Sequence, residues 1–186
     1  MAEGDTLVSP SDVLTFWFDE LTDRDWFQRS DALDRQIERR FRRTHLMLSR
    51  EMPWEWRADA VSRLAAIIVF DQFPRNMFRG SPLAFATDGL ARREAKLALK
   101  EGADQMVHAR QRAFFYLPFE HSETLEDQDK AVELFSKIDN PDMLDYAERH
   151  RDVIRRFGRF PHRNVILGRT STREEAVFLM QPGSSF

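Results

Sequence analysis

Cysteine is absent from this sequence of 186 residues, which excludes disulfides, thiolate metal sites and a cysteine nucleophile. A chain without disulfides suits a reducing compartment, so we expect a cytoplasmic location. No apolar run approaches the ~20 residues that a membrane-spanning helix needs. The stretch Met1–Pro10 also lacks the apolar centre of a signal peptide. We therefore expect no association with a membrane.

The sequence also lacks a large excess of charge of one sign, because it contains 28 Lys and Arg residues and 31 Asp and Glu residues. A chain with a net charge of −3 is not expected to bind nucleic acid through general basicity. The arginine cluster Arg39–Arg43 follows Asp31, Asp34 and Glu38, which predicts a solvated, ion-paired helix face. Phosphate loops, dinucleotide-binding glycine fingerprints and the Gly-x-Ser-x-Gly elbow of serine hydrolases are also missing.

Glycine and proline are scarce, with 7 and 8 residues, and apolar residues recur at spacings of three and four. This periodicity predicts an all-α fold, which we expect to form one domain over residues 1–186 with about seven to nine helices. Turns are expected near Thr22–Arg24, at Pro74 and around Pro118. Caps are expected at Ser9, Asn140 and Ser171 or Thr172. The predicted helices are Pro10–Phe18, Asp31–Arg50, Ala58–Phe73, Thr87–Lys100, Val107–Leu117, Ser122–Ile138, Pro141–Phe157 and Thr172–Met180.

Three predicted helices carry a polar residue on an otherwise apolar stripe. In Ala58–Phe73, which is apolar on every side and is expected to lie at the centre of the fold, Asp71 follows Val61, Leu64 and Ile68. Gln128 interrupts the apolar stripe of Ser122–Ile138, which includes Leu125, and His150 interrupts that of Pro141–Phe157, which includes Tyr146. Burying a polar group without partners costs several kcal/mol, at the upper end of ~2 to 7. Each residue is therefore either a satisfied structural group of the core or part of a site.

Two loops add polar residues of the same kind. The segment FYLPFEHSE at residues 115–123 holds Glu120, His121 and Glu123 just after Pro118, and such groups can act as general acids and bases. The segment FGRFPHRNVILG at residues 157–168 holds two guanidiniums, an imidazole and an amide, which suit a carboxylate or phosphate. Its polar residues are Arg159, His162, Arg163 and Asn164. In the structural alternative, these arginines neutralise Asp71, Glu120 or Glu123.

Several sequence blocks resemble the bacterial family known as domain of unknown function 924, over about Val13 to Leu179. The blocks are FWF at 16–18, DQFPRNMFRG at 71–80, FATD at 85–88, FYLPFEHSE at 115–123, DYAERH at 145–150 and RFGRFPHRNVILGR at 156–169. The resemblance implies an all-α fold of the tetratricopeptide-like superfamily, with antiparallel helix pairs. It supplies no activity and no catalytic residue.

From the residues themselves we predict a pocket that binds a small anionic ligand and can support acid/base chemistry. The expected acid/base groups are His121, His150, Glu120 and Glu123. The expected ligand-binding residues are Asp71, Arg75, Asn76, Gln128, Arg159, His162, Arg163 and Asn164. No cofactor is predicted, and no metal, because His-Glu-x-x-His and similar motifs are absent. The alternative is a non-catalytic module that binds a peptide or partner protein through Trp17, Trp26, Trp54 or Trp56.

Overall fold

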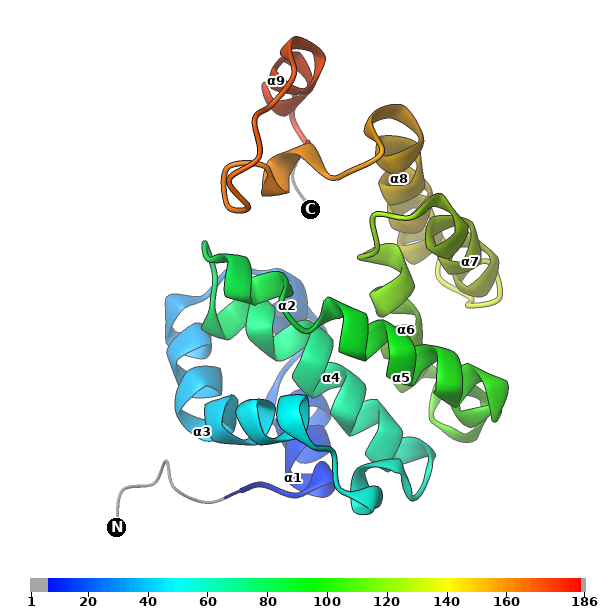
Figure 1. Ribbon diagram of the computed structural model, residues 1–186. Coiled ribbons are helices and arrows are strands. Elements are labelled where there is room, and N and C mark those ends of the chain that lie inside the picture. Colours follow the sequence, from blue (N-terminus) through cyan, green and yellow to red (C-terminus); the bar gives the residue numbers. More distant parts are fainter. Residues whose placement is uncertain (1–6, 185–186) are drawn as a thin grey trace. The chain divides into compact units, whose positions relative to one another are not determined.

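Helices make up all the regular structure of residues 7–184, the part of the chain that this computed structural model describes (Figure 1). The predicted all-α class is therefore confirmed, and no strand occurs in these residues. Short 3₁₀ turns and one π-helical segment, Thr15–Glu20, lie between the α-helices. The α-helices are α1 (Pro10–Leu14), α2 (Asp23–Phe27), α3 (Asp31–Arg50), α4 (Ala60–Met77), α5 (Asp88–Lys100), α6 (Ala109–Glu120), α7 (Leu125–Phe135), α8 (Pro141–Phe157) and α9 (Arg173–Leu179).

The backbone contacts divide the chain into two compact units. Unit 1 comprises the chain up to Arg79 and Leu83–Pro118, and unit 2 comprises Gly80–Pro82 and the chain from Phe119 onward. Helix α6 therefore begins in unit 1, and its last two residues belong to unit 2. The single domain over residues 1–186 and its tetratricopeptide-like pairing stay predictions, and each unit is described by itself.

Helix α4 forms the centre of unit 1, as its apolar sequence predicted. It packs against α1, α3 and α5, and Figure 1 shows it running through the middle of this unit. Residues Leu64–Phe73 are all buried. Helix α3 turns its predicted stripe of Leu33, Ile37, Phe41 and Leu48 inward, while Arg35, Arg39, Arg42 and Arg43 are exposed. Burial of this apolar stripe holds α3 against α4, while the charged face of α3 stays in solvent.

The aromatic run near the N-terminus lies within the core of unit 1. The side chain of Ser9 caps α1 in a capping box with Asp12, and Pro10 opens the helix as predicted. The Phe16 ring lies 4.9 Å from that of Phe41, and the Trp17 ring lies 5.6 Å from that of Phe73. Each such aromatic pair adds ~0.5–1.5 kcal/mol beyond the burial of its apolar area.

The prediction that Pro74 ends the central helix is wrong, because α4 continues to Met77. Proline lacks the N–H that would bind the carbonyl four residues earlier, here that of Phe70. The hydroxyl of Thr87 donates to this carbonyl instead, at 2.7 Å. A side chain from the start of α5 thus satisfies the acceptor that Pro74 cannot, and the helix passes through the proline.

Other predicted boundaries and orientations are also corrected. Helix α6 includes Pro118, and the expected turn near Thr22–Arg24 holds the start of the short helix α2. Helix α7 begins at Leu125 and ends at Phe135, so it is shorter than predicted at both ends. Three residues placed on core stripes are exposed: Val61, Leu125 and Tyr146.

Unit 2 is built on α7 and α8, which pack against each other. The Asn140 side chain caps α8, Pro141 opens it, and Gly158 follows it in the left-handed conformation, with φ of 68°. Of the two predicted capping boxes for α9, the pair of Thr172 and Glu175 is the one present. Beyond α8 the chain folds back so that Phe160 packs with Val153 and Ile154 in the core of this unit.

Candidate functional site

The residues predicted to form one site divide between the two units. Asp71, Arg75 and Asn76 lie in unit 1, on the last turns of α4. The other nine residues lie in unit 2, between the end of α6 and the segment that follows α8. These are Glu120, His121, Glu123, Gln128, His150, Arg159, His162, Arg163 and Asn164.

In unit 1, Asp71 and Arg75 belong to a network of ion pairs. Arg75 makes two hydrogen bonds to Asp88, of 2.9 and 3.1 Å, and its Nη1 lies 3.4 Å from Asp71. The carboxylate of Asp71, 1% exposed, also accepts a hydrogen bond from Gln72 at 2.7 Å. A buried carboxylate held by a guanidinium and an amide corresponds to the structural alternative.

Asn76 has a similar role one turn later. Its amide donates to Asp34 at 2.8 Å, and Arg79 binds the same carboxylate with two hydrogen bonds of 2.7 and 2.9 Å. These contacts join the end of α4 to the start of α3. They account for Asn76 without any ligand.

In unit 2, three of the predicted residues surround the ring of Phe160, which is fully buried. The imidazole centroids of His150 and His162 lie 5.5 and 5.6 Å from the ring centroid, and Cζ of Arg163 lies 4.5 Å from it. We call Phe160, His150, His162 and Arg163, together with His121 and Glu120, the Phe160 cluster. A guanidinium over an aromatic face is held by the cation–π attraction, ~0.5–2 kcal/mol depending on burial.

Glu120 and His150 form a buried pair inside the cluster, at 4% and 3% exposure. Nδ1 of His150 lies 2.8 Å from the carbonyl oxygen of Tyr146 and 3.6 Å from Oε1 of Glu120. Because both neighbours are acceptors, Nδ1 carries the proton and the lone pair lies on Nε2. A carboxylate beside Nδ1–H fixes the tautomer and stabilises an imidazolium when one forms.

Both imidazoles at Phe160 are neutral near pH 7. Burial lowers the pKa of His150 to about 3, against the hydrogen bond to the Tyr146 carbonyl, which raises it, and the Arg163 guanidinium adds to the lowering. Burial lowers the pKa of His162 to about 4, with Arg163 adding to the effect. His121 follows α6 directly and lies near enough to influence both groups.

Gln128 connects α7 to the end of α6, where Glu120 lies, and to the turn that follows. Its amide nitrogen donates to the carbonyls of Glu120 and Ser122, at 2.6 and 2.7 Å, and the residue is fully buried. The amide oxygen, Oε1, has no hydrogen-bond partner. Gln128 therefore positions Glu120 and also offers one unused acceptor.

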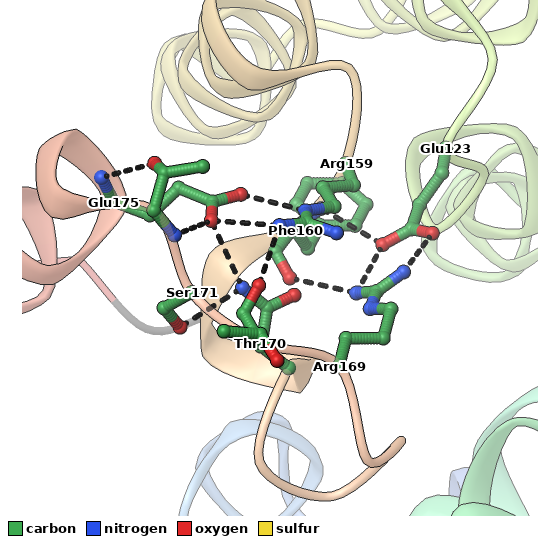
Figure 2. Close-up of polar contacts among 9 residues, drawn as sticks. Glu123, Arg159, Phe160, Arg169, Thr170, Ser171 and Glu175 are labelled. Atoms are coloured by element: carbon green, nitrogen blue, oxygen red, sulfur yellow. Dashed lines mark hydrogen bonds and ion pairs between the residues drawn. The ribbon is translucent and has the colours of Figure 1, made fainter.

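Glu123 is engaged with the segment after α8 (Figure 2). It accepts two hydrogen bonds from Arg169, of 2.7 and 3.0 Å, and one from the backbone N–H of Phe160 at 2.8 Å. Burial would raise the pKa of Glu123, but these donors hold it below its usual value. A carboxylate with this many donors anchors Phe160 and is a poor general base.

Arg159 is paired with Glu175 at the start of α9, as Figure 2 shows. The guanidinium donates two hydrogen bonds to this carboxylate, of 2.6 and 2.8 Å, and lowers its pKa to about 2. Asn164 donates to the same carboxylate at 3.3 Å and to Ser171 at 3.1 Å. Arg159 and Asn164 therefore tie the segment after α8 to α9 and stand outside the Phe160 cluster.

The residues that hold the cluster together were missed from the sequence. Phe160 is the ring at its centre. Arg169 binds Glu123, which in turn accepts a hydrogen bond from the backbone N–H of Phe160. Glu175 binds Arg159 in the neighbouring segment. The signal for Glu175 was present in the capping box, but the box does not show that the carboxylate also binds a guanidinium. Arg169 and Glu123 are 46 residues apart, and no local pattern links them.

Residues 7–184 contain no preformed metal site, because no group of three or more His, Asp or Glu side chains among them is arranged to hold an ion. Within the same residues, no helix has both the length and the apolar character needed to cross a bilayer.

Residues 13–183 match the family described as bacterial protein of unknown function (DUF924). The chain belongs to this family. A solved structure of a protein of unknown function from Agrobacterium tumefaciens is similar to it at 42% identity and a TM-score of 0.88. The similarity covers 92% of this chain and 96% of the Agrobacterium protein. No curated protein matches the chain. The family resemblance seen in the sequence blocks is thus confirmed, and it assigns no activity to the Phe160 cluster.

Proposed function

We propose that the Phe160 cluster of this DUF924 protein binds a small anion and takes up a proton when it does so. The observation that carries the proposal is the packing of His150, His162 and Arg163 around one buried ring, beside Glu120. Imidazole N–H groups and a guanidinium are the donors that carboxylates and phosphates use in proteins.

The charge balance of the surrounding segment supports an anion over a cation. Arg159 neutralises Glu175 and Arg169 neutralises Glu123, each through two hydrogen bonds. The imidazoles of the cluster are the groups that can gain a charge when an anion binds. Each imidazole that gains a proton adds a positive charge, so the cluster can match an anion that arrives with one or two negative charges.

Proton uptake follows from the pKa of His150. With a pKa of about 3, only a fraction on the order of 10⁻⁴ of His150 is protonated at pH 7. An anion beside the imidazole favours its charged form and raises this pKa. Glu120, close to Nδ1, assists the same change. Binding of the anion and protonation of His150 are therefore coupled.

Acid/base chemistry would use the same groups. Nε2 of His150 is the basic nitrogen, and its pKa approaches the working pH only when an anion is bound. His121 is the second candidate acid or base because it lies near His150. Glu120 acts as a positioning residue for His150, and Glu123 as an anchor for Phe160.

Titration with inorganic phosphate and with succinate, followed by NMR, tests the proposal. R163Q and H150Q should weaken binding at least ~10-fold, because each removes one charge-assisted hydrogen bond. R149Q is the matched control, since Arg149 lies on α8 with a side chain that is 56% exposed and pairs with Asp145. Equal binding by wild type, R163Q and R149Q would contradict the proposal.

The alternative, a surface for a peptide or partner protein, has less support. Trp17 and Trp56 are buried, and Trp26 is half-buried against Trp17 and Phe114. Trp54, 74% exposed, is the remaining candidate anchor. The cytoplasmic location and the lack of a nucleic-acid partner stay predictions.

A further inference from the structure

A mainly apolar groove of about 350 Å³ lies in unit 1 and shares no residue with the Phe160 cluster. Leu46 of α3 forms part of one wall, and Leu83 and Leu90 form part of the other. Leu46 and Leu83 are 45% and 54% exposed, so the mouth of the groove presents aliphatic surface to solvent. The remaining lining residues are Arg42, His45, Ser49, Phe78, Ala86 and Thr87.

A row of arginines runs along α3 beside this groove. No acidic residue occurs from Arg39 to Arg50, and the exposed residues of this stretch are Leu46 and four arginines. Leu46 lies four residues after Arg42 and four before Arg50, and residues at this spacing are neighbours on a helix surface. We call Arg39, Arg42, Arg43 and Arg50 the arginine stripe. It borders the groove because Arg42 and Leu46 both line the groove.

The arginine stripe keeps a positive charge when the neighbouring carboxylates are counted. Arg42 donates to Glu38 at 2.9 Å, so that guanidinium is already paired. Glu51 follows Arg50 in the chain but lies past the end of α3, at an extended residue. Arg39 and Arg50 are therefore the cations that we assign to a partner.

The opposite wall adds no competing negative charge. Asp88 is the one acidic residue of the stretch from Leu83 to Leu90, and Arg75 donates two hydrogen bonds to it, of 2.9 and 3.1 Å. A negatively charged partner at the groove thus meets aliphatic surface on one side and cations on the other.

We infer that the groove and the arginine stripe bind a short acidic segment of a partner protein that carries one large apolar side chain. The apolar side chain enters the groove against Leu46 and Leu83, and carboxylates on either side of it pair with Arg39 and Arg50. These two arginines are about 16 Å apart along α3, a distance that roughly five extended residues span. Recognition of acidic motifs by arginine clusters is a recurring mode of peptide binding. The inference goes beyond the function proposed for the Phe160 cluster and does not depend on it.

The shape and the residue types of the groove favour a protein over other polyanions. A recess accepts a side chain that protrudes from its partner, whereas the surface of a bilayer is flat. Single-stranded nucleic acids bind by stacking their bases on aromatic rings, but the exposed residues at the mouth, Leu46 and Leu83, are aliphatic. Anionic vesicles and RNA therefore serve as comparisons in the test.

Fluorescence anisotropy of three labelled peptides with the full chain tests the inference. The first peptide has a central phenylalanine flanked by glutamates, the second has serine in place of phenylalanine, and the third has glutamine in place of every glutamate. We expect the first to bind at least ~10-fold more tightly than the second, because its ring leaves water. It should also bind at least ~10-fold more tightly than the third at low salt, because charged pairs are then little screened.

Substitutions on α3 locate the binding surface. R39Q and R50Q should each weaken the first peptide several-fold, and L46E, which puts a carboxylate at the mouth of the groove, should weaken it at least ~10-fold. R29Q removes an arginine that is 72% exposed and precedes α3, so it is the matched control for loss of charge and should bind as wild type does. The methyl resonances of Leu46 and Leu83 should shift with the first peptide and not with the second.

Four results would each overturn the inference. The first is absence of binding of the phenylalanine peptide up to ~1 mM. The second is equal affinity for the phenylalanine and serine peptides. The third is equal binding by R39Q and R29Q. The fourth is tighter binding of oligouridine or of phosphatidylserine vesicles than of the phenylalanine peptide, which would assign the arginine stripe to another kind of polyanion.

Discussion

Acidification to pH 5.5 should destabilise the protein, because three histidines are held neutral in the folded chain. Burial lowers the pKa values of His45, His150 and His162 to about 4, 3 and 4. The unfolded chain titrates these groups near pH 6.5. Between pH 6.5 and about 4 the unfolded state therefore binds more protons, and the free energy of unfolding falls as the pH falls.

The size of the effect follows from the slope per group. One pH unit below the unfolded pKa, at pH 5.5, each neutral histidine costs a little over 1 kcal/mol, or roughly 4 kcal/mol for the three, as an upper bound. Carboxylates with lowered pKa values, such as Glu123 and Glu175, lose their contribution only below about pH 4.5. The loss above pH 5.5 is therefore assigned to the histidines.

Urea denaturation at pH 7.5 and at pH 5.5 measures the difference. H150Q should reduce the pH-dependent loss by about a third, since it removes one of three groups. H108Q removes an exposed imidazole at the start of α6 and controls for the loss of a histidine as such. A wild-type loss below ~1 kcal/mol, or a loss that H150Q leaves unchanged, would refute the reasoning.

Two further predictions concern buried partners and are read from denaturant unfolding. E175Q should lower the free energy of unfolding by ~2 kcal/mol, because the carboxylate holds Arg159, Asn164 and the N–H of Thr172. E174Q, at an exposed residue paired with Arg156, should change it by ~0.5 kcal/mol or less, and equal effects would contradict this assignment. T87V should cost ~1–3 kcal/mol, and less in a P74A background, where the new N–H can bind the carbonyl of Phe70. Strictly additive costs would contradict the link between Pro74 and Thr87.

Local features of the fold could be predicted from the sequence because their causes are local. Asn140 followed by Pro141 marks the start of α8, and the stripe from Leu33 to Leu48 marks the buried face of α3. The end of α4 could not be predicted, since it depends on Thr87, which is 17 residues from Phe70 in the chain. A proline leaves one helix carbonyl without its usual N–H donor, and a single sequence does not show whether a distant side chain supplies another.

The sequence predicted which polar residues of the candidate site are buried, but it did not predict which residues they contact. Polar groups on apolar stripes correctly marked Asp71, Gln128 and His150 as buried. Their roles depend on contacts between distant segments, such as Glu123 with Arg169. Arg159 shows the limit, because the residue expected to hold an anion is bound to a carboxylate of the chain itself.

Titration of His150 by NMR, with and without saturating inorganic phosphate, tests the central claim most directly. The claim is that the Phe160 cluster couples binding of an anion to protonation of this buried imidazole. We predict that phosphate raises the pKa of His150 from about 3 by ~3 units or more, as proton uptake near neutral pH requires, and that R163Q abolishes the shift. A pKa of His150 that stays the same when phosphate is bound, or a shift that R163Q preserves, would contradict the account.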